Sequence, residues 1–240
     1  LDAPGYLEAA RRAADFVLSR LVRDDGVLLR RYRDQEARYA GTLEDYACFV
    51  VGLLALYEAD FDPRWLAEAK RWSAQMVERF WVEAGGGFFL RGKDEPPRIV
   101  RSKELYDGAT PSGNSVAALA LLRLGRLTAD RPLEELARRA LDGFAEQLAR
   151  SPFAYPQMFI AVDFALGPTQ EIVIAGDPAH PETARMVRAV HGRFLPRAVL
   201  LLHPEGKPGE AIEALAPFVK TQPPQQGRPT AYVCENFVCH

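Results

Sequence analysis

Six segments of the chain carry apolar residues at helical spacing, and they alternate between two kinds of surface. In the first kind, as from Leu7 to Leu21, an apolar stripe lies opposite a charged side, which predicts a helix with one side in water. In the second kind, as from Tyr46 to Tyr57, nearly every residue is apolar, which predicts a helix that is buried all round. The first kind recurs at residues 63–78 and 130–148, and the second at residues 115–124 and 156–166. Each buried helix must be covered by neighbours, and this requirement constrains the fold more than any other feature.

This alternation describes three helical hairpins, each with an outer and an inner helix. Inner helices that pack side by side inside a sheath of outer ones form an α/α toroid, and the alternative is an open helical array. A closed toroid has about six such hairpins, so three of them predict a partial toroid. We therefore expect a mainly α fold, with the hairpins at residues 1–168.

The connection between residues 82 and 111 is too long for a plain link between helices. Three glycines at residues 85–87 end the preceding helix, and the apolar run from Phe88 to Leu90 predicts the first strand of a small hairpin. Residues 93–97 would form its tip, and Arg98 to Val100 its return strand.

In the last third of the chain, the spacing of apolar residues no longer follows the helical pattern alone. Buried-strand patterns at residues 171–175, 198–202 and 231–234 alternate with helical patterns at 181–194 and 211–219. This order predicts a small parallel α/β unit over residues 169–240, with right-handed crossovers. No glycine-rich nucleotide fingerprint follows a strand. Gly176, Asp177 and His203 stand at the ends of strands, where open parallel sheets bind ligands, and they form the lowest-ranked candidate site.

Composition excludes several partners. The chain of 240 residues has 30 Lys and Arg against 32 Asp and Glu, a formal net charge of −2, which disfavours a generic nucleic-acid or anionic-membrane binder. No apolar run reaches the roughly 18 residues of a membrane span, and no signal peptide is visible. Three cysteines make no disulfide framework, so a cytoplasmic location is expected. The chain begins at Leu1, which suggests a piece of a longer protein.

The loops before the three buried helices are polar, and parallel inner helices would bring them to one mouth. Carboxylates, tyrosines and amides around a wide cup suit a ligand with many hydroxyls, and two carboxylates about 5 to 9 Å apart can perform glycoside chemistry. The candidate catalytic residues are Asp107, Glu44 and Asp45. The candidate ligand-binding residues are Tyr46, Tyr106, Ser112, Asn114 and Tyr155.

Each of these residues also has a purely structural interpretation. Acids such as Glu44 and Asp45 in the first turn of a helix cap backbone amides and favour the helix dipole. Asp107 precedes a glycine in a turn pair, and Ser112 and Asn114 are good N-caps. Tyr155, before Pro156, can simply pack.

The cysteines and histidines predict no metal site or cofactor. Cys48 lies in a buried helical segment and is interpreted as a core residue. Cys234, Cys239 and His240 offer three ligands where a metal site needs about four. On a continuous strand the two cysteines would face opposite sides, although a turn between them would bring them together, so disulfide or metal chemistry stays open. None of the histidines has the spacing of a helical metal pair.

Five motifs stand out along the chain: LEDYA (43–47), GGGFF (85–89), DGATPSGNSVAALALLRL (107–124), EIVIAGDP (171–178) and AYVCENFVCH (231–240). Together they resemble the spermatogenesis-associated protein 20 family. The resemblance implies a thioredoxin-like N-terminal domain followed by a six-hairpin toroid, similar to N-acylglucosamine 2-epimerases and six-hairpin glycosidases. This chain would be the C-terminal portion. Toroidal epimerases use paired histidines, and residues 1–168 contain none, whereas related hydrolases use carboxylates at the mouth.

Two hypotheses about function follow. In the first, the mouth binds or processes a carbohydrate-like small molecule, with Asp107 as general acid or base, and Glu44 or Asp45 as the partner carboxylate. In the second, the chain is a non-catalytic scaffold that presents a substrate or protein partner to the thioredoxin-like domain. A scaffold would use the same acids in caps and ion pairs, beside an exposed apolar patch. The expected partners are the upstream domain, the remaining hairpins and, for an open half-ring, a second copy.

Overall fold

The computed structural model describes residues 4–95 and 101–239, which form eight α-helices and two small sheets. The helices are α1 (Pro4–Arg20), α2 (Leu43–Asp60), α3 (Pro63–Phe80), α4 (Gly113–Thr128), α5 (Arg131–Arg150), α6 (Pro156–Leu166), α7 (Pro181–His191) and α8 (Lys207–Leu215). The strands are β1 (Leu29–Arg33), β2 (Glu36–Ala40), β3 (Gln170–Ala175), β4 (Ala198–His203), β5 (Thr230–Glu235) and β6 (Val238–Cys239). Two 3-10 turns, η1 (Pro152–Ala154) and η2 (Pro217–Thr221), complete the list. None of these helices is long and apolar enough to cross a bilayer.

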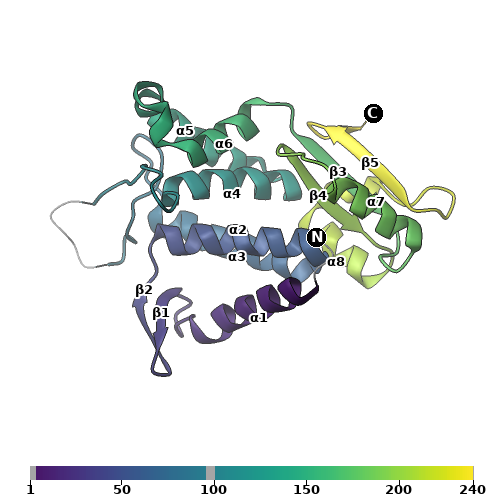
Figure 1. Ribbon diagram of the computed structural model, residues 1–240, viewed down its shortest axis with the longest axis horizontal. Helices are drawn as coiled ribbons and strands as arrows, with labels where there is room; N and C mark the ends of the chain where they lie inside the picture. Colours follow the sequence, from purple (N-terminus) through teal and green to yellow (C-terminus); the bar gives the residue numbers. More distant parts are fainter. Residues whose placement is uncertain (1–3, 96–100, 240) are drawn as a thin grey trace.

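The helices α2 and α4 lie side by side at the centre of the helical part, as Figure 1 shows. The pair Thr42 and Asp45 starts α2, because the Asp45 side chain accepts hydrogen bonds from both the amide and the hydroxyl of Thr42. Ser112 caps α4 by accepting from the Ser115 amide. The predicted hairpins, each an outer helix followed by an inner one, are not what forms here, because α3 packs on the preceding α2 and α5 on the preceding α4, whereas α3 with α4 and α5 with α6 make few contacts.

Aromatic side chains fill the space between α2 and α3. Trp65, Trp72 and Phe80 of α3 are fully buried, and the ring of Tyr46 on α2 meets Trp72 and Phe80 edge-on, with centroids 5.7 and 5.1 Å apart. Such rings bury the largest areas of any side chain, so this layer is a main source of hydrophobic stabilisation.

The larger sheet has the strand order β4-β3-β5-β6 and stands at one end of the helices (Figure 1). One face, with Ile172 and Ile174, packs against α7, and the other, with Val173 and Leu201, joins the main helical core. β3 and β4 are parallel, as predicted, but β5 pairs antiparallel with β3. The prediction of an all-parallel unit was wrong, since a buried-strand pattern does not reveal the direction of the strand. The proposed boundary at residues 168 and 169 stays a prediction.

The structure also corrects the predicted fold class. The chain is 55% helical and 16% strand, a mixed arrangement of helices and two small sheets, and a partial α/α toroid is not what it shows. Helical periodicity tells which side of a helix is buried, but it carries no information on the angle between hairpins or on what packs beside them. Here the sheet packs onto the same core as the helices.

The structure also corrects the predicted hairpin in the long connection and the bounds of two helices. Phe88 forms only an isolated bridge with Trp81 rather than a hairpin strand, and the expected return strand at 98–100 lies outside the described residues. A hairpin that the sequence analysis did not predict, β1–β2, precedes α2. The helix expected at 181–194 ends at His191, and the one expected at 211–219 begins at Lys207.

The end of α4 offers a test of backbone strain. Ala129 is exposed and adopts the left-handed conformation, with φ of 53°. A Cβ is unfavourable there, so Ala129→Gly should raise the free energy of unfolding by about 0.5–1 kcal/mol. Ala74→Gly, at an exposed position inside α3, is the matched control and should lower it by about 1 kcal/mol. Urea unfolding of the three proteins checks both signs, and a loss of stability at Ala129 would contradict the strain argument.

Candidate functional site

The N-terminal ends of α2, α4 and α6 meet at one end of the molecule, as the sequence predicted (Figure 1). Gly113 brings α4 against α2, because a Cβ at this position would lie 2.8 Å from Leu43 Cγ and 3.0 Å from the Glu44 nitrogen. Asp107 accepts a hydrogen bond from the α6 backbone at Met158. The predicted site residues therefore come from loops that are adjacent in space.

Asp107, the proposed general acid or base, is used to hold these loops together. It is 8% exposed, and its two carboxylate oxygens accept hydrogen bonds from the backbone amides of Ser112 at 2.8 Å and Met158 at 3.1 Å. Its own amide donates to Ala154. A carboxylate with both oxygens on backbone donors links the start of α4 to the start of α6.

Asn114 and Ser112 are likewise buried and fully engaged. The Asn114 amide accepts from the Phe88 amide at 2.8 Å and donates to the carbonyls of Phe88 and Glu104, at 3.0 and 2.8 Å. Asn114 therefore links the start of α4 to both ends of the long connection, at Phe88 and at Glu104. Ser112 caps α4 and exchanges a hydroxyl hydrogen bond with Ser115 at 2.9 Å.

The two acids at the start of α2 have different surroundings. Asp45 accepts from the Thr42 amide at 2.7 Å and lies 3.6 Å from Arg30 Nε, so it serves as a cap and an ion-pair partner. Within residues 4–95 and 101–239, the Glu44 side chain makes no cap or ion pair of this kind. Partial burial, followed by repulsion from Glu104 and Asp45, raises the pKa of the Glu44 carboxyl above its ordinary value of 4.5.

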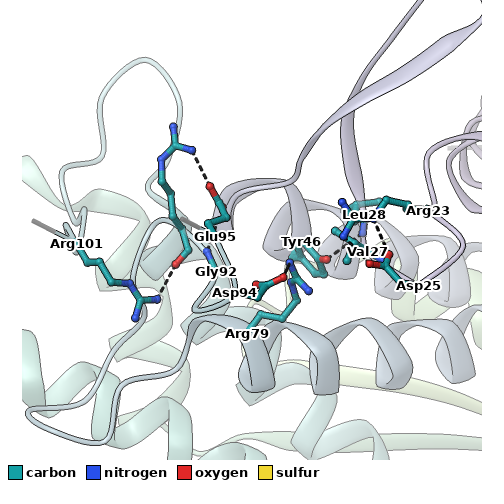
Figure 2. A network of polar contacts seen from close by, with 11 residues as sticks. Arg23, Asp25, Val27, Leu28, Tyr46, Arg79, Gly92, Asp94, Glu95 and Arg101 are labelled. Carbon is teal, nitrogen blue, oxygen red and sulfur yellow. Dashed lines mark hydrogen bonds and ion pairs between the residues drawn. The ribbon is translucent and has the colours of Figure 1, made fainter. Parts of the chain in front are cut away.

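Tyr46 is a core residue with its hydroxyl at the rim of this site. The hydroxyl accepts from the Leu28 amide at 3.0 Å, and burial raises its pKa. Figure 2 shows Tyr46 beside Arg79, which pairs with Asp94 at 2.9 Å. Arg101 and Glu95 extend the network by bonds to Arg91. These contacts fix the long connection against α3.

The two remaining tyrosines are less constrained. Tyr106 is 70% exposed, and Tyr155 is half-buried against the main core. Of the eight predicted site residues, Glu44 and Tyr106 are therefore the two that combine access to solvent with side chains not used in capping or packing. Among the described residues, no group of three or more His, Cys, Asp or Glu side chains could hold a metal ion.

Two expectations outside this site also change. Cys48 is exposed on α2 and not a core residue, because the side of α2 around Gly52 and Ala55 is left uncovered. His203, at the end of β4, is buried between the Gln222 carbonyl, 3.1 Å from Nδ1, and Glu213, 3.0 Å from Nε2. Asp177 caps the turn before α7 by accepting from the Ala179 amide, so these residues also have structural partners.

An apolar groove that the sequence did not predict lies between α5 and α6. Both helices pack on α4 but barely touch each other, and the groove between them has a volume of about 480 Å³. Its apolar lining includes Leu141, Leu148, Phe159, Val162 and Leu166. The apolar run from Phe159 to Leu166 was the available signal, since a helix that is apolar all round needs cover on every side.

The molecule is thus a helical module with a mixed sheet at one end, whose polar residues at the helix starts mainly hold loops. No family model matches the chain. It is 38% identical to human spermatogenesis-associated protein 20 over 200 residues and 37% identical to the rat protein over 203 residues, each covering 83% of this chain. It is also 28% identical to an uncharacterized protein of Caenorhabditis elegans over 98% of the chain.

These matches confirm the predicted relationship to the spermatogenesis-associated protein 20 family. The chain spans about a quarter of the length of the mammalian relatives, which is consistent with a portion of a larger protein.

Substitution of Asp107 tests whether it is structural. Asp107→Ala leaves two buried amides without acceptors, so we expect the free energy of unfolding to fall by roughly 2–4 kcal/mol. Tyr106→Ala, at the exposed neighbouring position, should change it by less than about 0.5 kcal/mol. Denaturant unfolding at pH 7 measures both. An Asp107→Ala protein of unchanged stability would return Asp107 to the list of free catalytic acids.

The raised pKa of Glu44 gives a pH-dependent prediction. The folded state binds the Glu44 proton more tightly than the unfolded state, so this residue lowers stability as the pH rises above 4.5 through the folded pKa. Glu44→Gln should therefore stabilise the protein at pH 7, and the gain should disappear below pH 4.5. Thermal unfolding across this range checks the trend, with Glu78→Gln at an exposed site of α3 as the control for charge. A gain that is independent of pH would contradict it.

Proposed function

We propose that this chain is a non-catalytic scaffold module, and that the groove between α5 and α6 docks another part of the same longer protein. The observation that carries the proposal is that most polar residues of the candidate site already make structural hydrogen bonds within the chain. Asp107, Asp45 and Asn114 are engaged by backbone groups and caps, which leaves no pair of free carboxylates among the described candidates.

The shape and chemistry of the groove support the choice of a protein occupant. Leu166 is 79% exposed and Phe159 is 37% exposed, although both lie in a helix whose average composition suits a core. Two charged residues, Arg138 and Asp142, also line the groove. An apolar groove with charged residues in its lining is typical of a surface that receives an amphipathic helix.

The length of the relatives favours an occupant from the same polypeptide. About three quarters of each mammalian relative lies outside the matched region, which supplies ample chain to cover this face. The expected thioredoxin-like domain would belong to that part, so the scaffold would position it against the rest of the protein.

Leu166→Glu tests the docking. In the longer protein this change should lower the melting temperature by several degrees and increase hydrogen exchange in α6, because a charge enters a covered groove. In the 240-residue chain alone the position is exposed, so a change of less than about 0.5 kcal/mol is expected.

Ile160→Glu is the matched control, since Ile160 is 49% exposed on the same helix but does not line the groove. Equal effects of the two substitutions in the longer protein would contradict the proposal. A dimer of the isolated chain that Leu166→Glu converts to a monomer would also overturn it, because the occupant would then be a second copy.

The carbohydrate hypothesis stays a prediction that the same protein can test. A thermal-shift screen against sugars and sugar phosphates should show no saturable shift if the chain is a scaffold. A selective shift that is lost in Glu44→Gln would favour a sugar site over the scaffold.

A further inference from the structure

The last hairpin of the chain holds two cysteines opposite each other. Cys234 on β5 is the direct cross-strand partner of Cys239 on β6, and a disulfide joins them. The two residues between the strands, Asn236 and Phe237, both have positive φ, of 52° and 63°. This is the conformation of a two-residue type I′ hairpin turn, which resolves the alternatives that the sequence left open for this pair.

The turn is anchored by contacts that do not involve the disulfide. The Phe237 amide donates to Glu171 Oε2 at 2.8 Å, and Arg126 donates to Asn236 Oδ1 at 3.2 Å. Glu171 is fully buried and pairs with Arg126 at 3.1 Å. The Phe237 ring packs on Phe218, with centroids 5.2 Å apart. A buried ion pair therefore holds the tip of the hairpin against the body of the protein.

The rest of the hairpin is also held without the covalent bond. β5 pairs with β3 along all six of its residues, from Thr230 to Glu235. The disulfide closes a loop with a sequence separation of only 5, and the stabilisation from a crosslink is smallest for short loops. The fold therefore does not require this bond, and the two thiols would stay in register after its reduction.

The two cysteines differ in how far each residue is exposed to solvent. Cys234 is 1% exposed, whereas Cys239 lies exposed on the edge strand. Gln222 reaches both, with its Nε2 at 3.4 Å from Cys234 Sγ and 3.2 Å from Cys239 Sγ. The Gln222 side chain is buried, and its Oε1 has no hydrogen-bond partner among the residues that the structure describes. Such an orphaned acceptor beside a disulfide points to a second state in which it is used.

We propose that Cys234 and Cys239 form a redox-active dithiol–disulfide pair that exchanges with an external dithiol. A thiolate of the reductant attacks Sγ of Cys239, the more exposed of the two residues, and forms a mixed disulfide, and the Cys234 sulfur leaves as a thiolate. The second thiol of the reductant is then deprotonated and attacks the reductant's first sulfur, which is bonded to Cys239 in the mixed disulfide. This step closes a disulfide within the reductant and releases Cys239. The reductant becomes a disulfide, two electrons pass to the cysteine pair, and the two protons of the reductant end on the two protein thiols.

Gln222 is a positioning residue in this exchange. Its Nε2–H donates to the sulfur that leaves as a thiolate, which stabilises the charge on a buried atom. In the dithiol state a rotation of the amide offers Oε1 to the thiol S–H of Cys234. His203 holds the backbone of Gln222 in place, and Glu213 holds His203. This site is independent of the α5–α6 groove, so the two proposals can fail separately.

The first test uses the chain with Cys48→Ser, so that only the pair can react. The protein is equilibrated in mixtures of reduced and oxidised glutathione, alkylated, and examined by intact mass. We expect one cooperative transition between a form with no alkyl group and a form with two, with an unchanged far-ultraviolet circular dichroism spectrum. A pair that stays in one state across all mixtures, or a reduction that unfolds the protein, would overturn the proposal.

The second test separates the roles of the sulfurs and of Gln222. In proteins that also carry Cys48→Ser, Cys239 in the Cys234→Ser variant should react with an aromatic disulfide reagent at least about tenfold faster than Cys234 does in the Cys239→Ser variant. Gln222→Leu should slow reduction of the disulfide by dithiothreitol about three- to tenfold. Gln225→Leu, at an exposed position nearby, should leave this rate unchanged. Equal thiol reactivities, or equal rates for both glutamine variants, would contradict the assigned attack and the role of Gln222.

Discussion

The close contact of α4 with α2 at Gly113 is the constraint on which the rest of the helical part depends. Only a residue without a Cβ allows the start of α4 to reach Leu43 and the Glu44 backbone. This contact sets two largely apolar helices side by side and leaves their outer sides to α3 and α5. It also brings polar loops together, where unsatisfied backbone groups would be costly.

Those loops explain why a cluster of sugar-binding residue types is not by itself a site. Asp107 and Asn114 satisfy backbone groups of segments far apart in the sequence, at Met158 and Phe88. Their polar atoms are therefore engaged before any ligand arrives. The same physics that makes Asp, Asn, Ser and Tyr suitable for hydroxyl recognition makes them suitable for joining irregular loops, and burial decides between the two uses.

The surfaces that stay free lie elsewhere. No described residue covers the apolar groove between α5 and α6, and the β5–β6 hairpin places the exposed residue Cys239 of the disulfide at the edge of the sheet. Both are consistent with a module that works as part of a longer polypeptide. The groove would hold the module in place, and the buried Arg126–Glu171 pair keeps the hairpin rigid while its covalent bond changes.

The sequence by itself determined that α2 and α4 are central, where α2 and α3 begin, two parallel strands, and the meeting of the polar loops. These follow from local rules, namely periodicity, capping residues and proline positions. Short motifs in the sequence also indicated the family relationship. The sequence also predicted a fully covered α6, which was wrong, because Phe159, Ile160 and Leu166 are exposed. Only the tertiary structure decided the direction of β5, the absence of a toroid, the exposure of Cys48 and the engagement of Asp107. Each of these depends on which distant segment lies beside the residue, and no local pattern encodes the angle, direction or partner of a long-range contact.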